Sequence, residues 1–457
     1  MISNAKLPAA YPHGLVYLRD GSSYIAFDPA RGAGFSLNKA GYVVARRIFA
    51  CAGRSLNAEE RLVAGRLRDL EAVPLRADRF RRAPPLTQLV LLLTNDCSMR
   101  CLYCYASAGR DKTEIPTAAV QSAVDYVVQN VVTSGLKRLN LSFHGGGEPT
   151  VAWHSLLAAH SYAQRRCHEL GLDLRCRLTS NGLWTESQGQ WIAAHMDSVL
   201  LSVDGPDDVM SLHRPTVSGA PSIPVIRRAI DILHSHGLEV RVRATVSGLT
   251  VERLPGLVEW FATLGATRVQ LEPLSSVGRA RASGIARPSA RRFCSSFTEA
   301  YKLGLRIGCR VMCSYLRPFR NSGEFCGALG RVFVLSPQGC ISTCHRVASE
   351  EDVASEGLAI GALNRNTGII AIDEQRLAAL TAARCKTPAG CVTCPAKYSC
   401  CGGCYAQNAA ASGSIHRRDR YRCAITRTLT TNFIRDYFHD QTCAHSRKEP
   451  AHGQRRS

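Results

Sequence analysis

Apolar runs of strand length alternate with longer amphipathic segments between residues 89 and about 308, and this alternation restricts the possible folds most. Six strand–helix units in strict alternation predict a parallel sheet with right-handed crossovers. Six units are too few for a closed eight-stranded barrel, so we expect an α/β fold with an open sheet. The expected strands are 89–94, 138–143, 173–179, 198–203, 239–246 and 267–272, and the expected helices are 116–133, 151–170, 186–196, 222–236, 251–264 and 288–307.

Three cysteines directly follow the first expected strand, in the run TNDCSMRCLYCYAS. Cys97, Cys101 and Cys104 have the spacing C-x3-C-x2-C. Three thiolates in one short loop can hold an iron–sulfur cluster and leave one of its four irons without a protein ligand. An iron with an exchangeable ligand is a reactive iron. From the three cysteines alone, a zinc knuckle or a chance group of buried thiols is the alternative.

A glycine-rich turn follows the second expected strand, in the run HGGGEP. Gly146 and Gly147 let the backbone approach a ligand closely, and Glu148 offers a carboxylate to an ammonium group. The carboxyl ends of parallel strands gather on one rim of such a barrel. We therefore expect this turn to lie beside the three cysteines and beside Ser180, Asn181 and Ser202.

The three cysteines, Tyr103 before the third of them, and the Gly-Gly-Glu-Pro turn occur in the order and spacing that resemble the radical S-adenosylmethionine (SAM) superfamily. The resemblance implies a partial (β/α)6 TIM-type barrel and a [4Fe–4S] cluster that binds SAM. It also implies that Tyr103 lies beside the adenine and that the turn binds the amino end of SAM. Reductive cleavage of SAM to a 5′-deoxyadenosyl radical is the reaction that this family performs.

The run Ser202-Val203-Asp204-Gly205, followed by His213-Arg214, resembles an element of the peptide-modifying branch of that family. The resemblance implies that Ser202 contacts the ribose and Arg214 the carboxylate of SAM. For Asp204, a role in this SAM-binding element and a place in an ordinary turn are equally good interpretations. Ser180 and Asn181 either contact SAM or end the third strand. Leu271, at the end of the sixth strand, is expected to pack on the adenine, or else in the core.

A second group of cysteines lies beyond residue 308 and resembles the seven-cysteine pattern of the SPASM extension. The resemblance implies two auxiliary [4Fe–4S] clusters, whereas two structural zinc sites are the alternative. One cluster would be held by Cys391, Cys394, Cys400 and Cys423, and the other by Cys326, Cys344 and Cys404. Cys313 is our choice for the fourth ligand of the latter, with Cys309, Cys340, Cys385 and an open iron as rivals.

The first 85 residues contain short alternating strands at 15–18 and 24–27 and helical patterns from about 35 to 50 and over 58–70. The run FSLNKAGYVVARRIF resembles the winged-helix, PqqD-like domain that binds leader peptides by strand addition. A generic cap on the barrel is the alternative. We expect four parts: a recognition domain (1–85), the radical SAM barrel (86–308), the SPASM domain (309–440) and a basic, disordered tail (441–457).

Composition favours a cytoplasmic metalloenzyme. No apolar run approaches the roughly 18 residues of a membrane span, and the N-terminal run has no apolar signal core. Twenty cysteines without an export signal favour thiolate ligands over disulfides. The formal charge of +21 indicates an anionic partner, which charge alone cannot identify. We expect a peptide partner, with no membrane and no nucleic acid.

Together these patterns predict a radical SAM/SPASM enzyme that oxidatively modifies, by cross-linking, a ribosomally synthesised precursor peptide. A flavodoxin or ferredoxin is the expected electron donor. One alternative is a sulfatase-type maturase that oxidises cysteine or serine to formylglycine. In that family an aspartate proton acceptor follows the cysteine aligned with Cys344; here it is His345, which could itself act as the base. The other alternative, a zinc-containing nucleic-acid-binding protein, lacks interleaved aromatic and basic residues, with aromatics at 7%.

Overall fold

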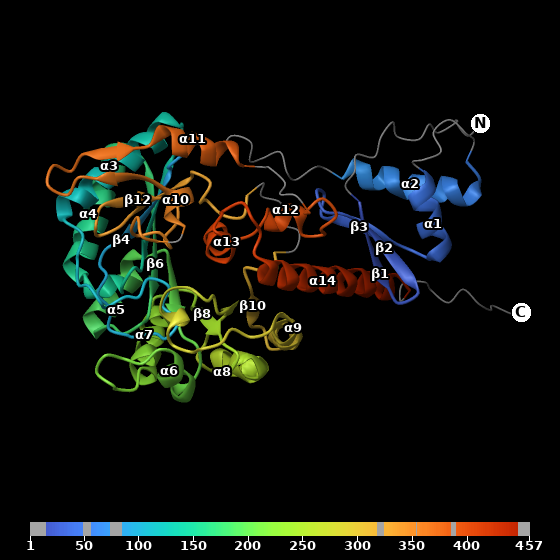
Figure 1. The fold of residues 1–457 in the computed structure, drawn as a ribbon. Helices are drawn as coiled ribbons and strands as arrows, with labels where there is room; N and C mark the ends of the chain where they lie inside the picture. Colours follow the sequence, from blue (N-terminus) through green and yellow to red (C-terminus); the bar gives the residue numbers. More distant parts are fainter. Residues whose placement is uncertain are drawn as a thin grey trace, which may run out of the picture.

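The computed structural model describes residues 15–48, 56–73, 85–317, 324–352, 354–384 and 390–446, with side chains through His439. Within these ranges a large sheet forms the centre of the molecule, and a separate three-stranded sheet lies near the N-terminus (Figure 1). Cys385, one rival for a cluster ligand, lies outside the described residues, as do residues 447–457 of the expected tail.

Eight neighbouring strands of the large sheet run parallel in the described chain, and six of them are those expected from the sequence. The sheet is open, as expected, and the other two strands extend it at each side. In spatial order the parallel strands are β10 (Arg310–Met312), β9 (Arg268–Pro273), β8 (Arg241–Val246), β7 (Ser198–Ser202), β6 (Asp173–Ser180), β5 (Arg138–His144), β4 (Gln88–Leu92) and β11 (Val332–Leu335).

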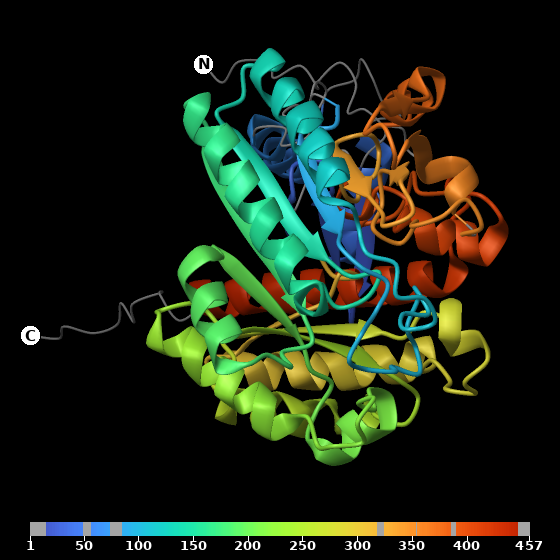
Figure 2. The same ribbon diagram turned by 90° about the vertical axis from the view of Figure 1, so that its left-hand side faces the viewer.

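Amphipathic helices follow the strands and cover the outer face of the sheet, as Figure 2 shows for the helices nearest the viewer. Strand alternation explains this layering: in β5 the buried Leu139, Leu141 and Phe143 alternate with Asn140 and Ser142. The helices are α3 (Thr117–Thr133), α4 (Trp153–Glu169), α5 (Glu186–His195), α6 (Asp207–His213), α7 (Ile223–Ser235), α8 (Leu254–Thr263) and α9 (Ala290–Arg306). All were expected except α6, which the sequence interpretation treated as part of a binding motif.

The small N-terminal unit consists of an antiparallel sheet of β1 (Val16–Asp20), β2 (Ser23–Asp28) and β3 (Ala33–Leu37), with α1 (Lys39–Arg47) and α2 (Ala58–Ala72). Asn38 caps α1 by accepting a hydrogen bond from the Gly41 amide, and Asn57 with Glu60 forms a capping box on α2. Residues 35–37, expected to open the first helix, belong instead to β3, because the Asn38 cap delays the helix.

The C-terminal region continues the large sheet. β11 pairs with β4, and β12 (Cys340–Ser342), β13 (Ala359–Leu363) and β14 (Ile370–Ile372) follow it antiparallel. The boundary expected at 308 therefore falls inside one continuous sheet. The remaining helices are α10 (Ser355–Leu358), α11 (Glu374–Ala382), α12 (Lys397–Cys400), α13 (Tyr405–Ser412) and α14 (Arg420–Ser446).

The long helix α14 joins the two units (Figure 1). It packs along α9, and near its end Ile434 and Phe438 are buried against Val16, Leu18 and other apolar residues of the small sheet. The helix crosses the boundary that we expected at residue 441, so the start of the disordered tail was placed too early. Among the described residues, no helix combines the length and apolar character needed to cross a membrane.

Candidate active site and cysteine centres

The loop that carries Cys97, Cys101 and Cys104 is held by two arginines that bind its backbone. Arg100 donates through Nη1 to the carbonyl oxygen of Cys97 at 2.5 Å. Arg279, from beyond the last barrel strand, donates to the carbonyl oxygens of Cys101 at 2.8 Å and Ala108 at 2.6 Å. These bonds satisfy the carbonyl groups of the loop and leave the three thiols to face the cavity described below.

Burial makes these thiols poor acids without a bound cation. Burial, with the nearby charge of Glu148, raises the pKa of Cys97 to about 12. Burial raises the pKa of Cys101 to about 11, although the Arg214 charge opposes the shift. Thiolates form here only when positive charge replaces the protons, which fits iron ligation. Among the described side chains, no three His, Cys, Asp or Glu converge on a single metal ion; cluster ligands need not, because each binds a different iron.

The glycine-rich turn packs directly on the cysteine loop. Gly147 donates to the Thr94 carbonyl oxygen at 2.7 Å, and Glu148 donates through its amide to the Asp96 carbonyl oxygen at 2.8 Å. A Cβ atom on Gly147 would overlap the Asp96 carbonyl oxygen, so a side chain is excluded there. The close approach brings the turn beside the three cysteines, as the sequence predicted.

The carboxylate of Glu148 is buried and accepts four hydrogen bonds. Oε1 accepts from Ser180 Oγ at 2.7 Å and from the amide and hydroxyl of Thr150, and Oε2 accepts from the Asn181 amide at 2.8 Å. Burial raises the pKa of Glu148, and these hydrogen bonds oppose the rise. Ser180 and Asn181 therefore orient Glu148 at the cavity wall. This role is compatible with both earlier interpretations, contact with SAM and the end of the third expected strand.

Tyr103 lies in a buried network with three charged or titratable groups. Its hydroxyl donates to Asp204 Oδ2 at 2.5 Å and accepts from Arg214 Nη1 at 2.7 Å. Asp204 also contacts His213 Nδ1 at 3.2 Å and accepts from the Thr245 amide at 2.9 Å. Burial acts to raise the pKa of Asp204, but the His213 hydrogen bond and the Arg214 charge outweigh it and lower that pKa. Asp204 is thus a buried anchor for Tyr103 rather than a simple turn residue.

One donor in this network has no partner. The Nε atom of Arg214 is buried and forms no hydrogen bond with any group that the structure describes, although the side chain lines the cavity. A buried N–H without an acceptor is costly. A ligand carboxylate at this point would satisfy it, so the residue fits the SAM carboxylate that the family resemblance assigns to it.

These side chains surround one cavity of about 190 Å³ at the carboxyl ends of the barrel strands. The sequence interpretation missed other residues that line it, including Tyr105, His144, Arg243, Glu272 and Gln407. Tyr105 could have been found, because it directly follows the third cysteine. Of the residues predicted as sites, the cavity brings together Cys97, Cys101, Tyr103, Cys104, Gly146, Gly147, Glu148, Ser180, Asn181, Ser202, Arg214 and His345.

Leu271 does not belong to this group. It pairs with Ala244 in the sheet, whereas the neighbouring pair Thr245 and Glu272 lines the cavity. Because side chains alternate along a strand, Leu271 faces the helices, where it is fully buried in the core. Leu271 therefore packs in the core, which was the alternative considered for it, and does not line the cavity.

His345 lines the cavity and stacks on His144 with 4.1 Å between ring centroids. Burial and the charges of His144, Arg346 and Arg243 hold the pKa of His345 well below its usual range. Burial and Arg243 lower the pKa of His144 to about 4. Both rings are therefore neutral at pH 7, so His345 has a free lone pair but is a weak base.

Among the C-terminal cysteines, thiols of each set expected from the SPASM resemblance raise one another's pKa. In the first, burial raises the pKa of Cys400 to about 11, and the charges of Cys394, Cys423 and Cys391 add to the shift. In the second, burial raises the pKa of Cys344 to about 12, and Cys404 and Cys326 add to it. Such mutual effects require short separations.

Cys313 stands apart from both sets in its surroundings. Burial and the charge of Glu272 raise the pKa of Cys313, and Arg422 opposes the shift. The Sγ atom of Cys309 faces the Ala266 carbonyl oxygen, and the pKa of Cys340, about 11 through burial, is further raised by Asp352 and Glu350. Of these three cysteines, Cys313 lies near Arg422, whose charge also acts to lower the pKa of Cys400. The role of Cys313 as a cluster ligand stays a prediction.

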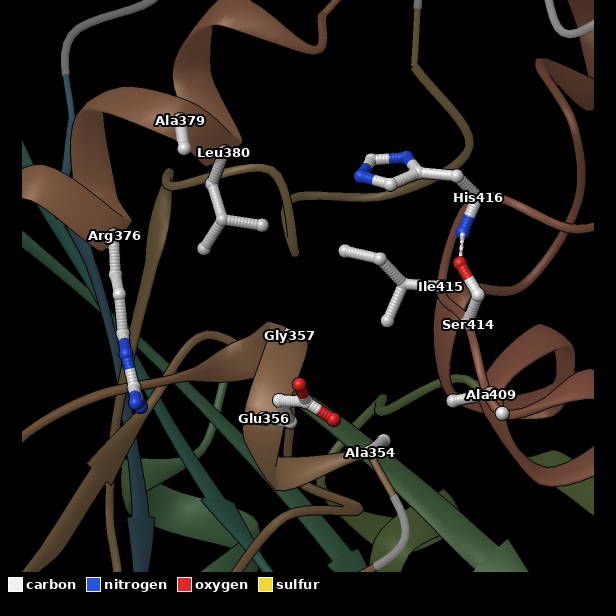
Figure 3. A pocket seen from close by; sticks show the side chains of 11 residues that line it. Ala354, Glu356, Gly357, Arg376, Ala379, Leu380, Ala409, Ser414, Ile415 and His416 are labelled. Atoms are coloured by element: carbon white, nitrogen blue, oxygen red, sulfur yellow. Dashed lines mark hydrogen bonds between the residues drawn. The ribbon is translucent and has the colours of Figure 1, made fainter.

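A second cavity, of about 290 Å³, lies between α10, α11 and the segment that follows α13. Figure 3 shows Leu380 and Ile415 facing each other across it, with Glu356 and Arg376 at one side and His416 at the other. Its charged residues are exposed, and none of the predicted site residues lies in it. The cysteine-lined cavity is therefore the candidate active site.

An open parallel barrel with three cysteines and a glycine-rich turn at its rim defines a radical SAM enzyme. Residues 91–261 match the model of the radical SAM superfamily. The chain carries a radical SAM domain, which implies a [4Fe–4S] cluster and SAM as cofactors, and it is an enzyme. The alternative of a zinc-containing nucleic-acid-binding protein gains no support.

Several of its relatives are named for action on proteins or peptides. Over 373 residues it is 24% identical to the serine-type anaerobic sulfatase-maturating enzyme of Klebsiella aerogenes, across 76% of this chain and 86% of that enzyme. The solved structure of native anSMEcpe with bound AdoMet and Cp18Cys peptide shares the fold at 17% identity with a TM-score of 0.59, over 78% of this chain and 100% of that one. Streptococcus suis SuiB bound to precursor peptide SuiA has a TM-score of 0.52 at 14% identity, over 90% and 98%.

We expect Tyr103→Phe to weaken SAM binding. The change removes a hydroxyl that bridges buried Asp204 and Arg214, and an unsatisfied buried charged group costs about 1–3 kcal/mol. Tenfold in affinity corresponds to about 1.4 kcal/mol, so the KM for SAM rises roughly 5- to 150-fold. The measurement is formation of 5′-deoxyadenosine at varied SAM concentration.

Tyr162→Phe is the matched control, because its hydroxyl also donates to a carboxylate, Asp125 at 2.7 Å, but on the outside of the barrel. Its KM for SAM stays at the wild-type value. An unchanged KM in Tyr103→Phe would show that the network has no part in holding SAM.

Proposed function

We propose that this protein cross-links a ribosomally synthesised precursor peptide by radical SAM chemistry. The observation that carries the proposal is the position of His345, which lines the same cavity as Cys97, Cys101 and Cys104 while it adjoins Cys344 of the second cysteine set. An electron acceptor held by that set would lie beside the substrate. The shared fold with SuiB, solved with a precursor peptide, supports a peptide substrate.

The bound cluster and SAM supply a 5′-deoxyadenosyl radical, which takes a hydrogen atom from the substrate. The chain's own residues orient these partners. Glu148 holds the ammonium group of SAM, Arg214 its carboxylate, Ser202 the ribose, and Tyr103 the adenine. Formation of the new bond releases one electron and one proton from the substrate, and His345 takes the proton.

In this proposal the C-terminal cysteines would hold two auxiliary [4Fe–4S] clusters, which would supply an acceptor for the electron. Cys391, Cys394, Cys400 and Cys423 bind one, and Cys326, Cys344 and Cys404 bind the other, with Cys313 as its fourth ligand. Support comes from the mutual charge effects among the thiols of each set. We include a cytoplasmic location, where thiols stay reduced, and a flavodoxin or ferredoxin as electron donor.

The N-terminal unit, residues 1–85 of the expected division, binds the leader of the precursor in this proposal. Its helices cover one part of the sheet through Ala26 and Leu37, and α14 covers another through Ile434 and Phe438. β3 is at the edge of the sheet in the described chain, and an edge strand can accept a peptide as an added strand.

Sulfatase-type maturation is the second candidate, because the Klebsiella relative performs it and the anSMEcpe fold is shared. It also needs a proton acceptor, and His345 is the candidate in both reactions, so the acceptor does not separate them. The two candidates differ in substrate: a short precursor peptide in one, and a cysteine or serine of a sulfatase sequence in the other.

The deciding experiment offers both substrates to anaerobically reconstituted enzyme with SAM and a reductant. The precursors to try are the short peptides encoded beside the gene. Loss of two hydrogens from such a peptide, located to a cross-link by fragmentation mass spectrometry, is the expected result. Formylglycine in a sulfatase peptide, with no change in the precursors, would replace this proposal with the second candidate.

We expect removal of residues 1–82 to separate peptide binding from chemistry. Cluster binding and SAM cleavage without peptide stay near wild type, because the described cavity contains no residue of that segment. Turnover of the full precursor falls about 100-fold or more, since an anchored leader raises the effective concentration of the core peptide.

The deletion uncovers Ile434 and Phe438, so the truncated protein should carry Ile434→Gln and Phe438→Gln to remain dispersed. A core peptide without its leader serves as the control and should be converted equally slowly by both forms. Equal precursor turnover by the truncated and full-length enzymes would make the N-terminal unit a cap on the barrel.

A further inference from the structure

Arg422 is a buried cation between the two C-terminal cysteine sets. It lies in the first turn of α14, directly before Cys423, and its side chain is 2% exposed. The guanidinium carbon is 3.9 Å from the ring centroid of Tyr315 and 4.4 Å from that of Phe325. Two aromatic faces thus fix the plane of the charge.

The stem of Arg422 packs on the loop that supplies a cysteine to each set. A Cβ atom on Gly403 would lie 2.9 Å from Arg422 Cδ and 3.3 Å from Nε. Gly403 separates Cys400, of one set, from Cys404, of the other. Nε forms no hydrogen bond with any group in the described chain, so one N–H of a buried guanidinium remains free at this loop.

The other two nitrogens connect Arg422 to the active-site cavity. Nη1 donates to Gln407 Oε1 at 2.7 Å, and Gln407 lines the cavity. Nη2 donates to the Ser314 carbonyl oxygen at 2.8 Å, and the Ser314 hydroxyl donates to Glu272 Oε2 at 2.7 Å. Glu272 also lines the cavity. The charge is therefore linked by hydrogen bonds to the substrate side as well.

A buried cation needs compensating negative charge. Glu272 is the carboxylate of this network, but it reaches Arg422 through Ser314. Cys400 and Cys404 lie on either side of Gly403, against which the stem of Arg422 packs. Anionic thiolate clusters on both sides of the loop would supply the charge that the guanidinium requires.

We propose that Arg422 is a positioning residue that raises the reduction potentials of both auxiliary clusters, so that they accept the electron released by the substrate. The proposal rests on the auxiliary clusters of the proposed function. Reduction adds one negative charge to an anionic cluster, and a buried positive charge beside it stabilises the reduced form. A free N–H directed at a cluster has the same effect.

The test compares midpoint potentials in the full-length chain with Cys97, Cys101 and Cys104 all replaced by alanine, so that EPR signals come from the auxiliary clusters alone. Arg422→Met keeps the length of the stem and removes the charge, and we expect it to lower the potentials. Arg422→Lys keeps the charge and should stay near the parent. Arg427→Gln is the control, because Arg427 is an exposed cation of the same helix near Cys394. Solvent screens its charge, so its loss changes the potentials little.

Unchanged potentials in Arg422→Met at full iron content would overturn the inference and leave Arg422 as a packing residue. If Arg422→Met does not retain iron, Arg422→Gln replaces it: potentials below those of Arg422→Lys support a charge effect, and potentials equal to those of Arg422→Lys contradict it. A parent protein without auxiliary iron would instead refute the clusters of the proposed function, a failure visible before any potential is measured.

Discussion

Replacement of Cys97, Cys101 or Cys104 by alanine is expected to abolish SAM cleavage while iron bound by the C-terminal cysteines remains. Each cysteine binds one iron of the catalytic cluster, and two thiolates cannot keep that cluster in place with an open iron. The C-terminal sets keep all their own ligands. The measurements are release of 5′-deoxyadenosine and iron content per chain.

Cys167→Ala provides the matched control, since Cys167 is buried in α4 as part of the core and is not part of the cavity. It should retain iron and SAM cleavage, with only the modest loss of stability that a smaller core side chain brings. A wild-type rate of 5′-deoxyadenosine release in any variant of the three loop cysteines would refute the assignment of the catalytic cluster.

The second large effect concerns the other end of the chain. Cys394→Ala or Cys400→Ala should remove one cluster's iron and nearly all modified peptide, yet leave some SAM cleavage that is not coupled to product. The catalytic cluster keeps its ligands, whereas the electron released by the substrate loses its acceptor. Iron content, the broad cluster absorbance near roughly 400 nm and peptide mass spectra give the three readouts.

The loop of Cys97, Cys101 and Cys104 and the C-terminal cysteine sets are far apart in sequence but adjoin in space, so this experiment needs a control. Tyr105, next to Cys104, has its hydroxyl 2.6 Å from the Gly145 carbonyl oxygen and 3.4 Å from that of His345, next to Cys344. A structural disturbance in the C-terminal sets could therefore reach the cysteine loop. Cys294→Ala measures that disturbance, because Cys294 is buried in α9 against the Ile425 carbonyl oxygen of α14 and is not a candidate ligand. Stoichiometric zinc without cluster absorbance in the wild type would favour the structural zinc sites instead.

Much of the barrel and its rim could be predicted because the signals are local. Strand and helix periods are written in consecutive residues, and each of the six expected strands begins or ends within one residue of its observed counterpart, β4 to β9, at one end at least. The cysteine loop and the Gly146–Glu148 turn follow strands whose carboxyl ends must meet. Spacing alone was therefore enough to place them around one cavity.

Other features depend on contacts between distant segments, which no local pattern encodes. β11 pairs with β4 although more than 200 residues separate them, and its four residues carry no distinctive period. The bridge of Tyr103 to Asp204 and Arg214, and the contact of Arg422 with Gly403, arise only after folding. The prediction for Leu271 had a different difficulty. β9 ends in consecutive buried residues, so its apolar pattern does not show which side chains face the cavity.

Helix α14 has a geometric consequence for any peptide held on the small domain. Cys423 lies near the start of the helix, and Phe438, fifteen residues later, packs on the N-terminal sheet. At about 1.5 Å per residue this is a rigid strut of roughly 22 Å. An extended chain needs about seven residues, at roughly 3.3 Å each, to cover that length. If the N-terminal unit holds the leader as proposed, the residue that reaches the cavity would be set by its count from the anchor, and α14 would act as a molecular ruler.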